Sequence, residues 1–318
     1  MNTPDGARKG RARLRRTLTF WVRPAFALRV VGRFQKLAGF DRSMALASSA
    51  LTALVPLALL AASVLSRLTA QDFADRIVQR YRLSGGGADA VHQLFAFAGE
   101  SDASLNVLGS IFLLISSLSL ARAVQRMFEQ TWELAPLSLR NSLYGLLWLC
   151  ALIGYAAVTG GIHAALGDGR RDVAASLIEV PVSALFFTWS GRVLSAKRLP
   201  WRGLLPFGLI AAILTCGYVI CATIYLPRLF DSYVARYGPV GAVFAMITAL
   251  FGTMLVLVGS AALGREVAEE LERIRHGLRP PDDEVRRQWA NVLGHARDRW
   301  RRVRGDRGRG LFTRGRRP

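Results

Sequence analysis

The sequence combines two properties that a soluble globular protein rarely shows together. Its 318 residues are 52% hydrophobic, yet they carry a formal net charge of +20. The charge is segregated, because residues 1–42 and 264–318 hold 27 of the 42 Lys and Arg residues and 11 of the 22 Asp and Glu residues. The segment 43–263 between them is apolar and has a net charge of only +4. This distribution excludes an ordinary soluble domain and indicates a membrane body with two basic ends.

Six apolar runs lie within the segment 43–263. A hydrocarbon core of about 30 Å needs about 20 residues at about 1.5 Å per residue. None of the runs alternates as a barrel strand would, and a helix pairs its own backbone groups, as a bilayer requires. We therefore predict an all-α, polytopic membrane protein with a bundle of six transmembrane helices. The predicted spans are 43–65, 104–124, 142–166, 173–194, 204–226 and 240–263.

The distribution of cations predicts the orientation of these spans. With the N-terminus inside, the cytoplasmic segments hold 34 Lys and Arg residues and the three external loops hold 8. Because cations are retained on the cytoplasmic side, both termini are predicted to be cytoplasmic. The first run is too long for a signal peptide and should remain as an anchor. The excess of Arg over Lys, with abundant Ala and Gly, suggests a bacterial protein.

Two segments outside the spans are predicted to form helices. Within 1–42, residues 18–36 place Arg29, Arg33 and Lys36 on one face and apolar side chains on the other. That pattern favours an interfacial helix whose cations contact lipid headgroups. The alternative interpretation is an ordinary amphipathic helix that packs on protein. The external loop, about 66–103, has amphipathic pieces on both sides of three consecutive glycines, which predicts a short helical hairpin.

The C-terminal end divides into a charged helix, 264–285, and an Arg-rich tail, 286–318, that we expect to be largely disordered. The tail holds 12 Arg residues and is tethered to a membrane. Anionic headgroups are therefore its nearest partner, and it can also serve only to fix topology. No RNA-binding pattern of cations and aromatic residues occurs, so no nucleic-acid partner is expected.

The search for catalytic and metal-binding motifs is negative. The sequence has no Gly-rich phosphate loop, no H-E-x-x-H and no G-x-S-x-G. Its three cysteines lie inside apolar runs and have no metal-ligand spacing with histidine. We expect no enzymatic activity, no cofactor and no metal.

Glu179 is the acid that lies well inside a predicted span. An intramembrane carboxylate usually faces the bundle interior or water, and it often has a function. Pro181 follows two residues later and removes a backbone donor. Together these two residues predict a polar break for a substrate or a proton. The structural alternative is a protonated Glu179 that bonds to a neighbouring helix.

Prolines and small residues mark where the predicted helices bend or pack. Pro56 lies within the first span, and Pro206 lies at the start of the fifth. Small residues recur every four positions from Gly208 and from Gly241, which allows close helix contact. Packing within the chain and a homo-oligomeric interface both stay open.

Short sequence motifs lie in or beside these spans, at Pro56, Trp132, Trp201, Pro206, Gly208, Tyr237, Gly238 and Gly241. In these motifs and in the order of its spans, the chain resembles the YihY/BrkB family of bacterial inner-membrane proteins, once labelled ribonuclease BN, over about residues 35–275. The matching pieces occur in the family's order, although the glutamate that the family has near the end of its last span is missing here. The resemblance implies a six-helix fold in the plasma membrane and an envelope or transport role. We expect a transporter or flippase-like protein for a lipid or amphiphilic solute, or alternatively a non-transporting envelope or scaffold protein that acts through partners.

Overall fold

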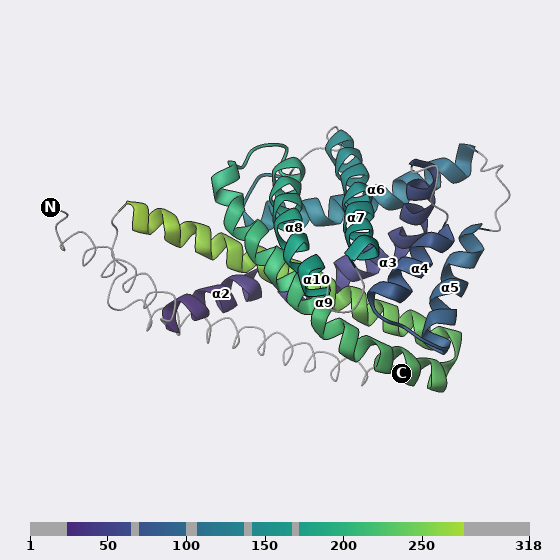
Figure 1. Cartoon of the computed structure of the whole chain (residues 1–318). Coiled ribbons are helices and arrows are strands. Elements are labelled where there is room, and N and C mark those ends of the chain that lie inside the picture. The colour runs from purple at the N-terminus through teal and green to yellow at the C-terminus, as the bar shows by residue number, and fades with distance from the viewer. Residues whose placement is uncertain (1–23, 65–69, 100–106, 137–141, 167–171, 277–318) are drawn as a thin grey trace, which may run out of the picture. The chain divides into compact units, whose positions relative to one another are not determined.

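The regular elements of the described chain are all helices, which confirms the predicted all-α class. The computed structural model describes residues 24–64, 70–99, 107–136, 142–166 and 172–276. Long helices occupy all six apolar runs (Figure 1). They are α3 (Gly39–Val64), α6 (Val107–Thr131), α7 (Ser142–Leu166), α8 (Asp172–Leu194), α9 (Trp201–Tyr237) and α10 (Pro239–Arg275). The shorter helices are α2 (Pro24–Lys36), α4 (Ala70–Arg80) and α5 (Gly86–Gly99).

The chain divides into two compact units, each with its own contacts. The terminal unit comprises residues 1–37 and 269–318, and the central unit comprises residues 38–268. Within the described residues, the terminal unit holds α2 and the end of α10. The predicted Arg-rich tail, 286–318, lies outside the described residues.

Three described helices are long and apolar enough to cross a membrane: α7 over Leu143–Ile162, α9, and α10 over Val240–Arg275. At about 1.5 Å per residue, the 37 residues of α9 span about 55 Å, well beyond a hydrocarbon core of about 30 Å. The predicted fifth span ends at residue 226, directly before Pro227. The helix instead continues through Pro227 to Tyr237, since buried Leu226 and Phe230 hold both sides of the proline in the core.

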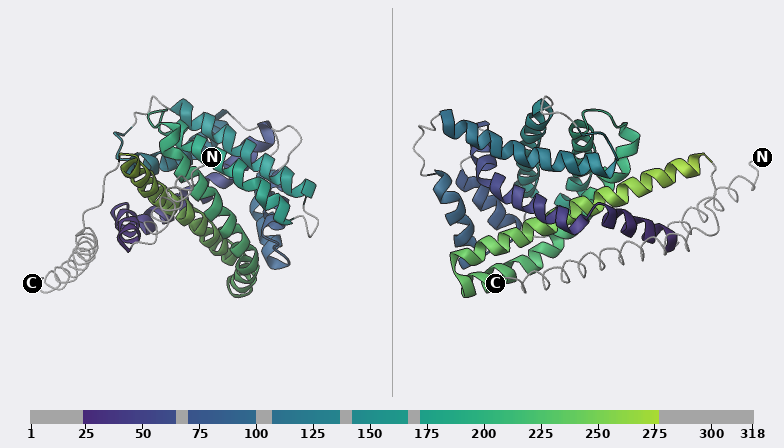
Figure 2. Two further views of the ribbon diagram at one scale, coloured as in Figure 1. Left: turned by 60° about the vertical axis from the view of Figure 1, so that its left-hand side comes forward. Right: turned by 180° about the vertical axis from the view of Figure 1, so that it is seen from behind.

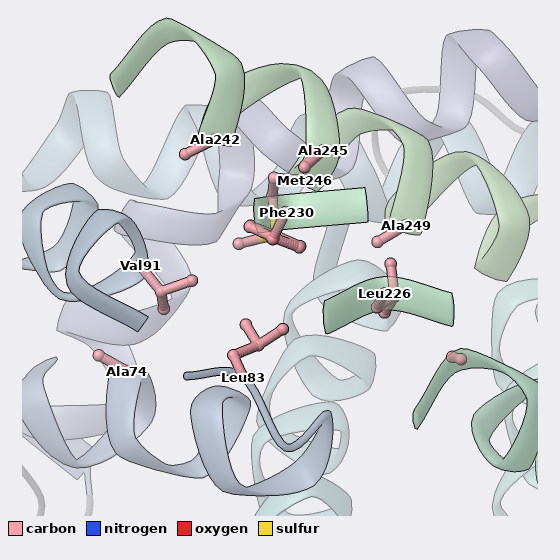
Figure 3. Close-up of a cluster of buried hydrophobic side chains, with 10 residues drawn as sticks. Ala74, Leu83, Val91, Leu226, Phe230, Ala242, Ala245, Met246 and Ala249 are labelled. Carbon is pink, nitrogen blue, oxygen red and sulfur yellow. The ribbon is translucent and has the colours of Figure 1, made fainter. Parts of the chain in front are cut away.

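A helical hairpin of α4 and α5 packs on α9 and α10, and Figure 3 shows the buried side chains that join them. Ile77 of α4 and Tyr81, which directly follows α4, pack against this cluster, as their shared helical face predicted. The hairpin closes tightly on α9, because a Cβ at Gly87 would lie 3.0 Å from Phe230 Cβ. The cluster comprises Ala74, Leu83, Val91, Ala222, Leu226, Phe230, Ala242, Ala245, Met246 and Ala249.

The remaining helices of the central unit pack in pairs around α8 and α6. α8 packs along α9 and α7, while α6 packs against α3, α7 and α8. α9 and α10 run antiparallel after a tight turn (Figure 2). The helices around α8 therefore place its polar residues next to α7 and α9, where the candidate site lies.

Candidate functional site

Glu179 lies on a buried polar face of α8. The residue is 8% exposed, whereas its neighbour Ile178 is 47% exposed and faces outward. One helical turn later, Ser183 is 3% exposed, and its Oγ lies 2.7 Å from the Tyr155 hydroxyl of α7. Ser190, still further along α8, is also buried. Because residues four apart share a helix face, Glu179 and Ser183 form a polar face toward the interior of the protein.

Aromatic rings close this polar face at one end. Tyr155 stacks on Phe186, with ring centroids 4.2 Å apart and planes within 6°. Phe187 lies 6.3 Å from the Tyr155 ring and 6.4 Å from the Phe207 ring of α9, measured between centroids. The Tyr155 hydroxyl therefore reaches Ser183 from a ring that is fixed by packing, which orients the hydrogen bond.

Pro181 does not join Glu179 at one polar break. Residues two apart on a helix point to nearly opposite sides, and the structure places Pro181 on the exposed side of α8. The helix continues without interruption from Asp172 to Leu194. The polar character of α8 therefore comes from Glu179 and Ser183, while Pro181 only removes one backbone donor.

A second polar cluster, which sequence reasoning missed, lies near the middle of α9. The Tyr218 hydroxyl donates to the Ala249 carbonyl at 2.7 Å and lies 3.1 Å from the Tyr225 hydroxyl. Gly252 of α10 leaves the space for this ring, because a Cβ there would lie 2.6 Å from Tyr218. The available signal was two tyrosines seven residues apart, on one helical face of an apolar run.

Four of the matching motif positions meet where α6, α8 and α9 come together. Trp132, which directly follows α6, is buried, and its ring centroid lies 5.8 Å from that of Phe207 in α9. Gly208, next to Phe207, has no room for a side chain, because a Cβ would overlap Thr188 and would lie 2.6 Å from the Ala184 carbonyl oxygen of α8. Trp201 and Pro206 begin the same helix. These residues set helix packing rather than forming a polar site.

The other motif positions form the turn between α9 and α10 or lie inside α3. Gly238 has φ +58°, a conformation that favours glycine, and its N–H donates to the Val234 carbonyl at 2.8 Å to end α9. A Cβ at Gly241 would overlap the Tyr233 carbonyl oxygen. Tyr237 is 59% exposed, and Pro56 is a buried residue within α3. The small residues at 208 and 241 therefore serve packing within the chain.

The three cations of α2 have different surroundings within the terminal unit. Arg29 is 6% exposed, and its Nη2 lies 2.6 Å from Glu270 Oε2 at the end of α10. Arg33 pairs with Glu269 at 2.8 Å. Lys36 is exposed. Headgroup contact stays a prediction for this helix, and Lys36 is the cation whose exposure suits it best.

Metal-ligating side chains do not gather in the described part of the chain, where no group of three or more His, Cys, Asp or Glu residues could hold a metal ion. The cysteines of the described chain are free thiols on α7 and α9.

A family model named virulence factor BrkB matches residues 30–284, which includes α3 to α10 and most of α2. The chain belongs to the virulence factor BrkB family. It is an integral membrane protein of that family, with bacterial relatives described as UPF0761 membrane proteins. The fold and the candidate site described above all lie within the matched residues, apart from the first turns of α2.

Relatives of this BrkB-family chain are distant in sequence. It is 24% identical over 244 residues to a UPF0761 membrane protein of Stenotrophomonas maltophilia strain R551-3, covering 72% of this chain and 57% of that protein. It is 26% identical over 317 residues to one of Alkalilimnicola ehrlichii, covering 92% of this chain and 68% of that protein. The chain thus spans just over half the length of the S. maltophilia relative. No solved structure matches it.

Proposed function

We propose that this BrkB-family protein is a six-span, non-enzymatic plasma-membrane protein that moves a lipid or another amphiphilic solute. One observation carries the proposal, namely the buried polar face of α8 with Glu179 and Ser183. Ionisable residues inside membrane helices are costly and commonly mark solute or proton pathways. Ser190 supports the proposal, because its Oγ is buried and makes no hydrogen bond with the described residues. A polar group of a passing solute would satisfy such an atom.

The decisive test replaces Glu179 with glutamine. Glutamine keeps nearly the same shape and still forms hydrogen bonds, but it does not titrate. We expect the rate at which the purified protein, reconstituted in liposomes, moves a fluorescent phospholipid between leaflets to fall by about tenfold or more. Dithionite quenching of the outer leaflet measures that rate.

The matched control is Asp231→Asn, which makes the same change of charge at an exposed position of α9. It should translocate lipid at the unmodified rate. Both variants should elute as single peaks in size-exclusion chromatography. A Glu179→Gln variant that elutes normally and translocates lipid at the full rate would contradict the transport proposal.

We further propose that the apolar runs on α3, α6 and α8 cross the membrane together with those on α7, α9 and α10, with both termini in the cytoplasm. The support is the split of 34 to 8 cations between the two sets of connecting segments. Reporter fusions truncated after Leu137 and Lys197 should report the cytoplasm, and a fusion after Gly86 should report the outside. A cytoplasmic signal at Gly86 would reverse the topology.

A second candidate is a non-transporting envelope protein that acts through partners, including further copies of itself. The observation that favours it is close packing along α8 and α9, where Gly208 lies against the Ala184 carbonyl and Gly191 lies against the side chains of Leu204 and Phe128. Such packing gives a rigid scaffold rather than a moving one. Lipid translocation no faster than in protein-free liposomes, from a well-folded protein, would favour this candidate.

A further inference from the structure

Four cations lie in or beside the connection between α8 and α9: Arg192 at the end of α8, Lys197 and Arg198 in the connection, and Arg202 at the start of α9. All but Arg192 are exposed, but Arg192 and Arg198 donate to carbonyl groups of the protein, which separates them from Lys197 and Arg202. Arg192 donates to the Leu199 carbonyl at 3.3 Å, and its guanidinium lies 5.4 Å from the centre of the Trp201 ring. Both contacts fold the connection back onto the start of α9.

Arg198 fixes the connection to α6 through a buried acid. Its guanidinium donates to the Ala135 carbonyl at 2.6 Å and to the Ser195 carbonyl at 3.0 Å, and it lies 3.5 Å from the Glu129 carboxylate. Glu129 is 4% exposed and also accepts from Gln125 at 2.9 Å. A buried carboxylate with these partners holds the short connection in one position.

Lys197 and Arg202 are left facing outward from this fixed connection. Among the described residues, neither forms an ion pair. The first turn of α9 contains no acid, so Arg202 adds its charge at the end of the helix where the macrodipole is already positive. The exposed cations thus create a positive surface that no carboxylate of the described chain neutralises.

An apolar stripe runs directly away from these cations along α9. Trp201 is 39% exposed, and Leu205, Leu209 and Ile213 follow at four-residue spacing with 54%, 52% and 52% exposure. α9 is long and apolar enough to cross a membrane. A tryptophan between cations and an exposed apolar stripe is typical of the level of lipid headgroups.

We propose that Lys197, Arg202 and Trp201 form a binding surface for one anionic phospholipid. The headgroup phosphate lies between the two cations, the indole lies at the glycerol level, and an acyl chain follows the stripe from Leu205. Charge complementarity and the continuous apolar stripe favour a lipid over a soluble anion, because only a lipid has both a phosphate for the cations and an acyl chain for the stripe. This surface is independent of transport, so it stands even if Glu179 proves structural.

The test counts phosphatidylglycerol molecules retained by the full-length protein, using native mass spectrometry in neutral detergent. We expect Lys197→Asn with Arg202→Gln to bind phosphatidylglycerol about tenfold more weakly, because two surface cations are lost. Asparagine suits position 197, whose φ is +60°. Phosphatidylcholine with the same acyl chains should bind equally to both proteins.

The matched control is Arg228→Gln with Arg236→Gln, which removes two exposed cations from the other end of α9. Its net charge equals that of the test variant, so nonspecific binding by the basic ends cancels in the comparison. This control should retain phosphatidylglycerol. A variant that conserves the charges, Lys197→Arg with Arg202→Lys, should also retain it, and this result tests the proposal even if Lys197→Asn with Arg202→Gln fails to fold. Equal losses in test and control variants, or displacement of the lipid by inorganic phosphate, would overturn the proposal.

Discussion

Gly208→Ala is expected to lower the free energy of unfolding by about 3 kcal/mol, because α9 has no room for a side chain where it meets α8. The added Cβ would overlap the Thr188 hydroxyl and lie 2.6 Å from the Ala184 carbonyl oxygen. The Thr188 hydroxyl already donates a hydrogen bond of 2.7 Å to that carbonyl oxygen, so it does not move aside freely. The two helices must therefore separate, which also disturbs the neighbouring Phe207 and Trp132 packing.

Gly217→Ala provides the control on the same helix, because no atom lies within 4 Å of the position of its Cβ. Alanine is favoured over glycine in a helix by about 1 kcal/mol, so this variant should be unchanged or slightly more stable. Thermal unfolding in detergent, followed by size-exclusion chromatography, measures both. Equal stability of the two variants would show that α8 and α9 are not in close contact at Gly208.

Arg29→Ala should be the most damaging change of a charged residue in the terminal unit. Glu270 is only 2% exposed, and the substitution removes the cation nearest to its carboxylate. Removing one partner of a buried ion pair typically costs about 3–5 kcal/mol. Arg273 remains 3.5 Å from Glu270, which should bring the loss to about 3 kcal/mol. For a chain of this size, we expect a fall in Tm of about 5 °C.

Two comparisons separate the ion pair from a general loss of charge. Lys36→Ala removes an exposed cation from the same helix and should change Tm little. Arg29→Met with Glu270→Met removes both buried charges and should recover most of the stability, because neither charge is then left unpaired. If the double variant is as unstable as Arg29→Ala, the loss comes from the shape of the Arg29 side chain and not from a stranded carboxylate.

Several features of the fold could be predicted because they depend on local composition. Each apolar run became a helix, since its length and its lack of alternation left no other structure that pairs the backbone in lipid. The α4–α5 hairpin followed from helical faces interrupted by glycines 85–87. The end of α9 was not predictable, because Pro227 normally ends a helix and only the packing of Leu226 and Phe230 on α10 carries it further.

Ion pairs between residues that are far apart in the chain could not be predicted from the sequence. Arg29 and Glu270 are 241 residues apart, and their neighbours in the chain give no sign of pairing. The amphipathic pattern of α2 placed Arg29 on a polar face, and the same face suits either headgroups or a carboxylate. Burial decides between them, and burial depends on what packs against that face.

The sequence by itself determined that the chain is an all-helical membrane protein with long apolar runs, and that Glu179 is an unusual residue, because hydrophobic runs and isolated charges are local properties of the chain. Only the tertiary structure decided that Glu179 shares a face with Ser183 while Pro181 turns away, that Tyr218 reaches Ala249, and that Arg198 pairs with Glu129 while Lys197 and Arg202 stay exposed. These outcomes depend on how helices rotate against one another. That rotation is set by the fit of side chains from several helices at once, such as Thr188 against Gly208.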